Sequence, residues 1–385
     1  MREERKEACK NMNGSYEEQT DSYGPYTVPG SGSYQEHGSE RVGRPTTESL
    51  TKSRPQILIA GLPGSGKSSV QSVVFHKISP HETVFLAATE SVHKHEVGNS
   101  AFVQLQILDI PGKLGSVEAE ENLDSVMKGC SALIFVIDVT SENTDEALSR
   151  LKDTILRAYN ANSNIFIEVF IHKADALTEE QRRYCQSELQ ERVDDELRES
   201  NDKVINRISY RTTSIFDHSV FEAFSLVVQR LISELGALES MLDLLVNRCI
   251  MEKAFLFDEV SKLYIATDST PYHPQDFELC SDLIEVNIDL GGIYSEKIAK
   301  KGAADKDDDD KSSKGRSSTA TIHLSNNMIL YLREVSQYLL LVCIMRRQNF
   351  DGNVGLIEYN VKIFAEGLRE IIERRRQELN LPSES

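Results

Sequence analysis

The sequence predicts an α/β fold with a mostly parallel sheet and helices on both faces, followed by a smaller α+β domain. From Arg54 to about Gly236, short apolar runs alternate with stretches whose apolar residues recur at helical spacing. Beyond about Leu238, several strand-like runs follow one another and helical patterns stand at the ends. Alternation of strands and helices indicates βαβ units, whereas consecutive strands flanked by helices indicate an antiparallel sheet.

Four apolar runs predict strands in the first domain. Those at 56–60, 132–137 and 165–171 are nearly continuous, which is typical of strands buried on both faces. The run at 102–108 alternates apolar and polar residues, which predicts a more exposed strand near the edge. Two helices are predicted by apolar residues on one face: Val70, Val73, Val74 and Ile78 in the first, and Ala147, Leu148, Leu151, Ile155 and Ala158 in the second.

The second domain is predicted to begin with a helix near Leu238–Val246 and to end with one whose apolar stripe runs from Leu356 to Ile372. Between them lie strand-like and other apolar runs, at 254–257, 263–267, 279–284, 286–290, 321–324, 328–332 and 338–345. The polar segment at about 295–319 is predicted to be a mobile loop. Residues 1–54 contain no Ile, Phe or Trp, which predicts a disordered arm. The predicted divisions are therefore 1–54, 55–236, 237–378 and a tail at 379–385.

Charge and hydropathy exclude some classes of function. The 385 residues include 43 Lys and Arg and 61 Asp and Glu, so the net charge is −18. Such an acidic chain is a poor candidate for binding nucleic acid or an anionic membrane surface. No apolar run approaches the roughly 20 residues of a membrane span, and no secretory or lipidation motif is present. We expect a cytoplasmic protein without direct membrane insertion.

A phosphate-binding loop is the clearest motif. Residues 61–68, GLPGSGKS, match G-x-x-x-x-G-K-[ST] between a predicted strand and a predicted helix. The backbone N–H groups of such a loop surround phosphate oxygens, and Gly64 and Gly66 allow close approach. Lys67 is expected to reach the β- and γ-phosphates, and the Ser68 hydroxyl to bind Mg²⁺.

Two further motifs stand at the ends of predicted strands. Asp109-Ile110-Pro111-Gly112 matches D-x-x-G, in which the carboxylate holds Mg²⁺ through water and the glycine N–H meets the γ-phosphate. His172-Lys173-Ala174-Asp175 has the place and form of the [N/T]-K-x-D base reader. Its Asp175 is expected to accept hydrogen bonds from guanine N1 and N2, and the backbone of Ser214 and Ile215 to meet guanine O6. A P-loop ATPase, the rival interpretation, would lack this reader.

At these residues the sequence resembles the Rag GTPases of the RagC/RagD type. The resemblance spans residues 55–377 and rests on GKSS at 66–69, VVFHK at 73–77, FIHKAD at 170–175, TSIFDHS at 213–219, FEAF at 221–224 and EKAFLFD at 252–258. His172 before Lys173 is itself a Rag feature. The resemblance implies a Ras-like P-loop G domain followed by a roadblock, or longin-like, domain.

The resemblance also implies a setting. Rag proteins of this type pair with a RagA/RagB-type GTPase through their C-terminal domains. A membrane scaffold complex holds the heterodimer at the lysosome or vacuole, where it reports amino-acid sufficiency to the TOR kinase complex. Switch I is expected within 78–97, with Thr83 and Thr89 contacting GTP or GDP. Lys67 and Thr89 are the implied catalytic residues, and Ser68 and Thr89 the Mg²⁺ ligands. The nucleotide-binding set is Gly64, Ser65, Gly66, Lys67, Ser68, Ser69, Thr83, Thr89, Asp109, Gly112, His172, Lys173, Asp175, Ser214 and Ile215.

Three hypotheses remain open from the sequence. The first is a guanine-nucleotide switch that hydrolyses GTP slowly and needs a GTPase-activating protein. The second is a pseudo-GTPase, since Lys113 stands where the glutamine that orients the attacking water is normally found. The third is a dimerisation adaptor in which the nucleotide is only structural.

Overall fold

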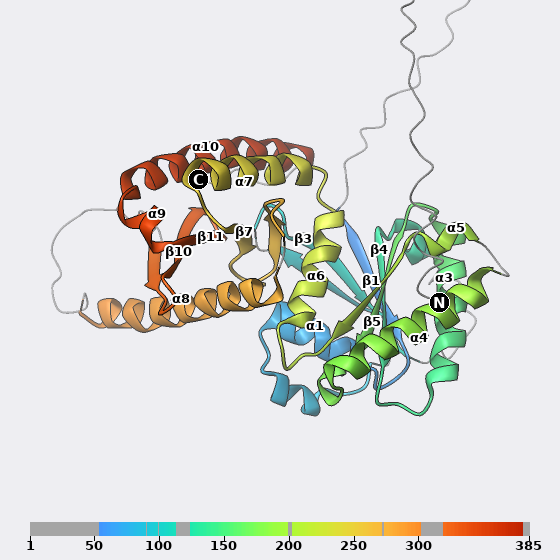
Figure 1. Ribbon diagram of the computed structural model, residues 1–385. Coiled ribbons are helices and arrows are strands. Elements are labelled where there is room, and N and C mark those ends of the chain that lie inside the picture. The colour runs from blue at the N-terminus through green and yellow to red at the C-terminus, as the bar shows by residue number, and fades with distance from the viewer. Residues whose placement is uncertain are drawn as a thin grey trace, which may run out of the picture. The chain divides into compact units, whose positions relative to one another are not determined.

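The computed structural model describes residues 54–89, 91–98, 100–112, 124–198, 202–271, 273–301 and 319–379. The predicted arm therefore lies outside the described residues, apart from Arg54. Two sheets with their helices lie within one compact unit (Figure 1). Among the described helices, none combines the length and hydropathy that a membrane crossing needs.

The first sheet has six strands in the order β2-β3-β1-β4-β5-β6. All neighbours are parallel except β2 and β3. This confirms the predicted α/β class with a mostly parallel sheet. The strands are β1 Gln56–Gly61, β2 His93–Gly98, β3 Gln104–Asp109, β4 Ala132–Asp138, β5 Phe166–His172 and β6 Ile208–Thr213.

Helices cover both faces of this sheet, as predicted. One core contains apolar side chains of α1 and α6 together with Ile57 and Ile59 of β1. A second core packs α3 and α4 against Leu58 of β1 and against β4 and β5. The helices are α1 Lys67–His76, η1 Pro80–Phe85, α3 Thr144–Ala161, η2 Ala174–Ala176, α4 Glu179–Arg198, α5 Asp202–Ile205 and α6 Ser219–Arg230.

The edge of this sheet differs from the prediction in one respect. Strand β3 is buried from Leu105 to Asp109, so the expectation of a more exposed strand is wrong. The reason is β2, which pairs antiparallel with β3 and forms the edge itself. The apolar pattern did not indicate β2, because its sequence HKHEVG has a single buried residue, Val97.

The second sheet is antiparallel, as predicted, with the order β8-β7-β11-β10-β9. Helices α7 and α10 cover one face and α8 covers the other (Figure 1). The bounds are α7 Leu235–Cys249, β7 Lys253–Asp258, β8 Tyr264–Thr267, α8 Pro274–Lys301, β9 Thr319–His323, β10 Met328–Ser336, β11 Leu339–Arg346, α9 Arg347–Asp351 and α10 Val354–Leu379.

Helix α8 corrects the predicted loop. The apolar runs at 279–284 and 286–290 belong to this single helix, which buries Phe277, Cys280 and Ile284 against the sheet. The helix continues to Lys301, so the loop expected at 295–319 is wrong for 295–301. Residues 302–318 lie outside the described residues. Spacings of three and four residues between buried positions explain why a helix forms here.

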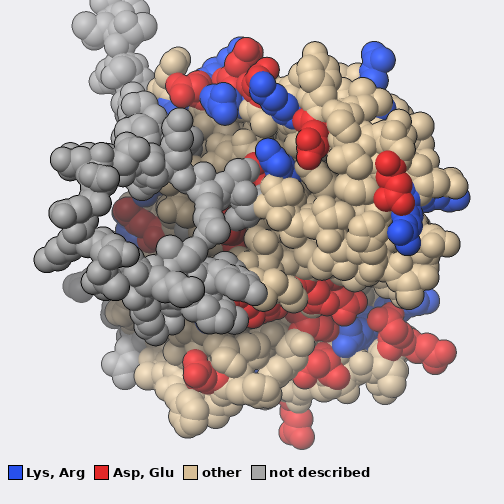
Figure 2. Space-filling view, turned by 90° about the vertical axis from the view of Figure 1, so that its left-hand side faces the viewer, with Lys and Arg blue, Asp and Glu red and all other residues tan. Residues whose placement is uncertain are grey.

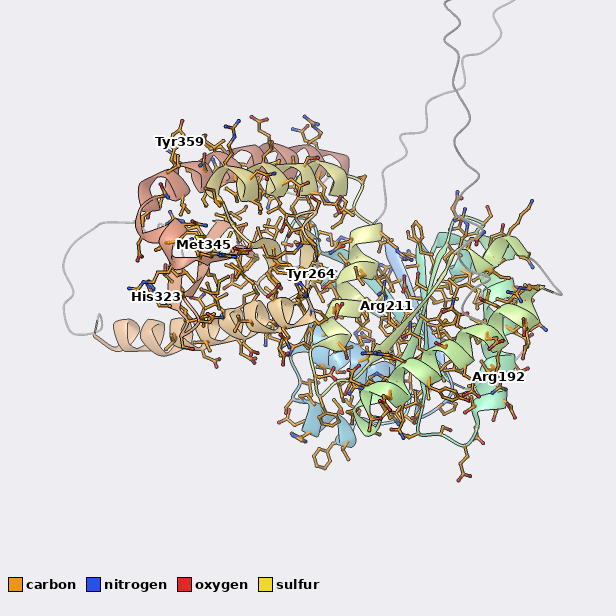
Figure 3. The ribbon with its side chains drawn as sticks, viewed as in Figure 1. Arg192, Arg211, Tyr264, His323, Met345 and Tyr359 are labelled. Carbon is orange, nitrogen blue, oxygen red and sulfur yellow. The ribbon has the colours of Figure 1, made fainter. Side chains whose placement is uncertain are left out.

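The two sheets are joined by a shared core and by specific hydrogen bonds. The core that contains α1 and α6 continues into α7, β7 and α10. At the junction, the buried Tyr264 of β8 donates its N–H to Ser225 Oγ of α6 at 3.0 Å, and Gln229 donates to the Tyr264 carbonyl at 3.1 Å. Figure 3 shows Tyr264 and Arg211 in this region. The predicted boundary near residue 236 falls at the start of α7 and remains a prediction.

The surface carries the acidic excess. On the face shown in Figure 2, Asp and Glu side chains gather across the lower half, whereas Lys and Arg are scattered. Helix α8 contributes Asp276, Glu278, Asp282 and Glu285 to the acidic surface. This face therefore presents no continuous basic surface in its described part.

Candidate functional site

The loop between β1 and α1 forms a concave donor site at a helix N-terminus. Gly66 caps α1 with φ +98, a backbone angle that glycine tolerates and other residues rarely adopt. Lys67 is 6% exposed, and its Nζ donates to the carbonyl oxygens of Gly61 at 3.0 Å and Leu62 at 2.9 Å. Burial lowers the pKa of Lys67, and the nearby Asp109 opposes that shift. A loop of this form binds phosphate.

Three oxygen-bearing side chains converge beside this loop. Ser68 Oγ donates to Asp109 Oδ2 at 2.7 Å and lies 2.9 Å from Thr89 Oγ1. Thr89 Oγ1 donates to the same carboxylate oxygen at 3.3 Å. The other oxygen, Asp109 Oδ1, is buried without a hydrogen-bond partner in the described chain. Two hydroxyls and an unsatisfied carboxylate oxygen beside a phosphate loop fit Mg²⁺, which binds few protein oxygens and completes its shell with phosphates and water.

The predicted base reader lies at the end of β5. Lys173 has φ 62, and its Nζ donates to the Gly64 carbonyl at 3.0 Å and pairs with Asp138 Oδ2 at 2.5 Å. Burial raises the pKa of Asp138, but hydrogen bonds from Lys173 and Thr140 outweigh it, so this pKa lies below its ordinary value. Lys173 thereby connects the predicted base reader with the phosphate loop and with the end of β4.

His172 fills the space beneath the phosphate loop. Its side chain is 1% exposed, and Nδ1 lies 3.0 Å from Thr213 Oγ1. A Cβ at Gly66 would lie 2.6 Å from its ring. Burial, followed by the charge of Lys173, lowers the pKa of His172 to about 4. The imidazole is therefore neutral at physiological pH and acts as a packing and hydrogen-bonding group.

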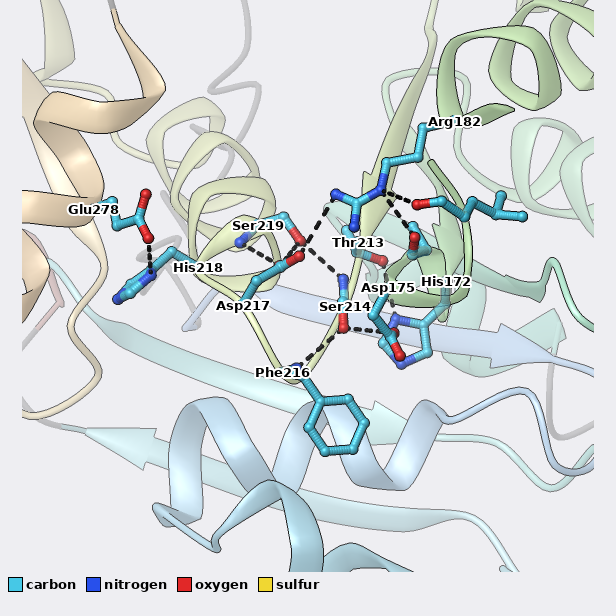
Figure 4. A network of polar contacts seen from close by, with 12 residues as sticks. His172, Asp175, Arg182, Thr213, Ser214, Phe216, Asp217, His218, Ser219 and Glu278 are labelled. Atoms are coloured by element: carbon cyan, nitrogen blue, oxygen red, sulfur yellow. Dashed lines mark hydrogen bonds and ion pairs between the residues drawn. The ribbon is translucent and has the colours of Figure 1, made fainter. Parts of the chain in front are cut away.

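The loop between β6 and α6 supports Asp175 from behind (Figure 4). The Ser214 hydroxyl donates to Asp175 Oδ1 at 2.7 Å and accepts the Phe216 N–H at 3.1 Å. The Ser214 N–H donates to Ser219 Oγ at 2.8 Å, and Asp217 pairs with Arg182 at 3.6 Å. These contacts fix the carboxylate that is predicted to read the base.

A cavity of about 530 Å³ connects these parts. Its volume lies within the range of small-molecule sites, about 300–1,000 Å³. The predicted residues that line it are Gly64, Gly66, Lys67, Ser68, Ser69, Thr83, Thr89, His172, Lys173, Asp175 and Ile215. The structure therefore brings together residues from the phosphate loop, the region of 80–89 and the two strand ends.

Four predicted residues lie beside the cavity rather than on its wall. Asp109 accepts a hydrogen bond from Ser68, and Ser214 donates one to Asp175. Ser68 and Asp175 line the cavity themselves. Ser65 is 2% exposed, and its hydroxyl has no hydrogen-bond partner among the described residues. The Gly112 backbone abuts the phosphate loop, because a Cβ there would lie 2.3 Å from the Pro63 nitrogen.

Thr83 makes a local hydrogen bond, and its contact with the nucleotide stays a prediction. Its hydroxyl donates to the Pro80 carbonyl at 2.7 Å, within its own 3-10 turn, although the residue also lines the cavity. Lys113, which raised the question of hydrolysis, lies outside the described residues.

Sequence reasoning missed several residues of the cavity wall. Pro80, Val84, Leu86, Thr140 and Phe216 line the cavity, and Asp138 pairs with Lys173. Asp138 closes the apolar run of β4, so its place at a strand end was a usable signal. Phe216 directly follows Ser214 and Ile215 and carried no signal of its own.

Comparison with known proteins agrees with this geometry. Residues 56–284 match the Gtr1/RagA G protein conserved region. The chain is 45% identical to Ras-related GTP-binding protein D of Mus musculus, over 84% of this chain and 70% of that protein. It is 44% identical to Ras-related GTP-binding protein C of Homo sapiens, over 83% and 77%.

Fungal and more distant relatives give the same assignment. GTP-binding protein gtr2 of Schizosaccharomyces pombe is 42% identical, over 83% of this chain and 98% of that protein. Relatives of the RagA/Gtr1 type match at 26–28% identity. The chain therefore belongs to the Rag family of G proteins, and within that family to the RagC/RagD type.

Proposed function

We propose that this protein is a guanine-nucleotide switch that binds GTP or GDP with Mg²⁺ and hydrolyses GTP slowly. The observation that carries the proposal is one cavity that is lined both by the phosphate loop and by Asp175. The names of its relatives as GTP-binding proteins support the same ligand.

The phosphates would lie on the loop at 64–69, against backbone N–H groups and the Lys67 ammonium. Ser68 and Thr89 would hold Mg²⁺, and Asp109 would orient them and the water around the ion. Held there, Mg²⁺ would supply positive charge that offsets the charge of the phosphates. The orphaned Asp109 Oδ1 supports this assignment, because a buried carboxylate oxygen without a partner is costly.

Guanine would be selected by Asp175. A carboxylate accepts hydrogen bonds but donates none, which matches the N1 and N2 donors of guanine and not the N6 donor and N1 acceptor of adenine. Ser214 donates its hydrogen bond to Asp175 Oδ1 and not to Oδ2. The Ser214 N–H already donates to Ser219 Oγ, so the backbone N–H of Ile215 is the proposed partner of guanine O6, and the expected contact from Ser214 is not proposed.

Hydrolysis would proceed by in-line attack of water on the γ-phosphate, with Lys67 stabilising the transferring charge and Thr89 closing the site. The residue directly after Gly112 is Lys113 and not a glutamine. We therefore expect a rate of unassisted GTP hydrolysis that is low among G proteins. Fast hydrolysis should need groups supplied by an activating protein.

Membership of the Rag family supports a proposal about the partner and the location of this protein. We propose residues 55–236 as the G domain and 237–378 as a roadblock domain that pairs with a RagA/RagB-type GTPase. Among the described strands, β9 has one neighbour, β10, so its outer edge offers unpaired backbone groups. A scaffold complex would hold the heterodimer at the lysosomal or vacuolar membrane, where it would act on the TOR kinase complex.

The test is direct. The chain, co-expressed with a RagA/RagB-type partner, is titrated with GDP, GTP, ADP and ATP in Mg²⁺. We expect binding of the guanine nucleotides alone, at two sites in each heterodimer because the partner is itself a GTPase, and loss of one of these two sites in Lys67→Met. The exposed Lys94→Met, on β2, is the control and should bind as the wild type does. Equal affinity for adenine nucleotides, or unchanged binding in Lys67→Met, would refute the assignment.

A further inference from the structure

Phe216 is a large apolar side chain at the rim of the cavity. Its ring lies in the loop between β6 and α6 and is 55% exposed, although the residue lines the cavity wall. Among the described residues, the other aromatic ring on the wall belongs to His172, which is 1% exposed and packs beneath the phosphate loop. Of these two rings, only Phe216 therefore has a face free to cover a ligand.

The loop holds Phe216 in a fixed relation to the base-reading carboxylate. The Ser214 hydroxyl accepts the Phe216 N–H at 3.1 Å and donates to Asp175 Oδ1 at 2.7 Å. Ser214 and Ser219 are joined in turn by the hydrogen bond from the Ser214 N–H. One hydroxyl thus sets both the carboxylate that recognises a base edge and the backbone that carries the ring (Figure 4).

The ring also lies beside the segment at 80–86, which contributes to the cavity wall. The centroids of Phe216 and His81 lie 5.5 Å apart, with an interplanar angle of 50°. His81 belongs to η1, within the predicted switch I, and Pro80, Val84 and Leu86 from the same segment line the cavity. Aromatic pairs at this separation attract each other, so His81 supports the Phe216 ring from the switch side.

We propose that Phe216 is a base-stacking residue of the nucleotide site, covering the base that Asp175 reads. The inference rests on the proposed nucleotide-binding function. It assigns two separate tasks within the site. Asp175 distinguishes guanine by its hydrogen-bonding edge, whereas Phe216 adds affinity that does not depend on the base edge, because every base has a π face.

Binding of two nucleotides tests this division. The full chain with its partner subunit is titrated with GDP and with inosine diphosphate, which lacks the 2-amino group, and the affinity of this chain's site is fitted separately from that of the partner GTPase. In Phe216→Ala we expect affinity to fall about tenfold for both nucleotides, the scale of one base–aromatic contact. The ratio between the two nucleotides should stay as in the wild type, and Phe216→Tyr should restore the affinity.

The control is Phe85→Ala. Phe85 lies in η1 and is 87% exposed, but it does not line the cavity. It should bind both nucleotides as the wild type does. Unchanged affinity in Phe216→Ala would overturn the inference. A change in the GDP to inosine diphosphate ratio would also overturn it, because Phe216 would then act through Asp175. Failure of the wild type to bind GDP would instead refute the proposed function itself.

A spectroscopic measurement shows whether a nucleotide base or a protein partner covers the side chain at position 216. The chain contains no Trp, so Phe216→Trp introduces its only indole. We expect saturating GDP to protect that indole from acrylamide quenching, whereas Tyr359→Trp, at an exposed position on α10, should be unaffected. The inference fails if GDP gives no protection, and equally if only a protein partner gives it.

Discussion

Arg375, near the end of α10, donates from Nε to the carbonyl oxygen of Ala101, in the connection between β2 and β3, at 3.1 Å. The same guanidinium pairs through Nη1 with Glu234 Oε2 at 2.6 Å and lies 5.6 Å from the centroid of the Phe102 ring. Arg375 is 5% exposed. One buried cation thus joins the last helix of the chain to the β2–β3 hairpin, whose other end carries Asp109.

Loss of this cation should destabilise the whole unit. Arg375→Met keeps the length of the side chain but leaves Glu234 without its counter-charge and the Ala101 carbonyl without a donor. Breaking a buried pair from one side costs about 3–5 kcal/mol. Glu234 is partly exposed, so we expect about 3 kcal/mol by urea unfolding.

The neighbouring Arg374→Met is the matched control. Arg374 is exposed on the same helix turn, so its substitution should stay within about 0.5 kcal/mol. Adding Glu234→Gln to Arg375→Met should recover part of the loss, because the unpaired charge is then gone. Equal effects of the two arginine substitutions would show that the Arg375 contacts contribute nothing.

Acid should weaken the fold through His172. Burial lowers its pKa from an ordinary 6.5 to about 4, so the folded state resists a proton that the unfolded state accepts. The contribution of His172 to the free energy of unfolding is complete above pH 6.5 and is lost as the pH falls toward about 4. Between pH 7.5 and pH 5 this amounts to about 2 kcal/mol.

His172→Asn isolates that contribution. Asparagine keeps a side chain that can hydrogen-bond to Thr213 but does not titrate. We expect the wild type to lose about 2 kcal/mol more than the variant between the two pH values, measured by denaturant unfolding without nucleotide. Parallel losses in the two proteins would mean that His172 takes up its proton in the folded state.

The sequence predicted the elements that are marked by a pattern of apolar residues. It did not predict the elements that form only because a neighbouring strand supplies backbone hydrogen-bond partners. The buried runs of β1, β4 and β5 indicated central strands. Strand β2, HKHEVG, carries no such pattern and forms because β3 supplies its backbone partners. In the site, local motifs indicated Lys67 and Asp175. The strand end at Asp138 could have indicated a site position, but its partner Lys173 follows the neighbouring strand, so local sequence could not identify the contact between them.

Asp175→Asn should change the preferred base from guanine to xanthine. The amide can donate to the additional oxygen of xanthine but cannot accept from both N1 and N2 of guanine. A site with unpaired buried polar groups loses discrimination on the order of 10⁴-fold. Competition between GDP and xanthosine diphosphate measures this change. Asp195→Asn, at an exposed position on α4, should leave the preference as it is. Undiminished affinity for GDP in Asp175→Asn would show that Asp175 does not contact the base.

Lys113→Gln should raise the intrinsic rate of GTP hydrolysis several-fold. A glutamine amide both donates and accepts, so it can hold the attacking water, whereas the lysine ammonium only donates. Positive charge near the γ-phosphate would stabilise bound GTP as much as the transition state, and equal stabilisation gives no acceleration. We therefore expect the wild type to turn over at or below roughly 10⁻⁴ s⁻¹ in single-turnover assays. Lys113→Ala should be as slow as the wild type. If Lys113→Ala abolishes a measurable rate, or Lys113→Gln leaves the rate unchanged, then Lys113 is itself catalytic or another residue positions the water.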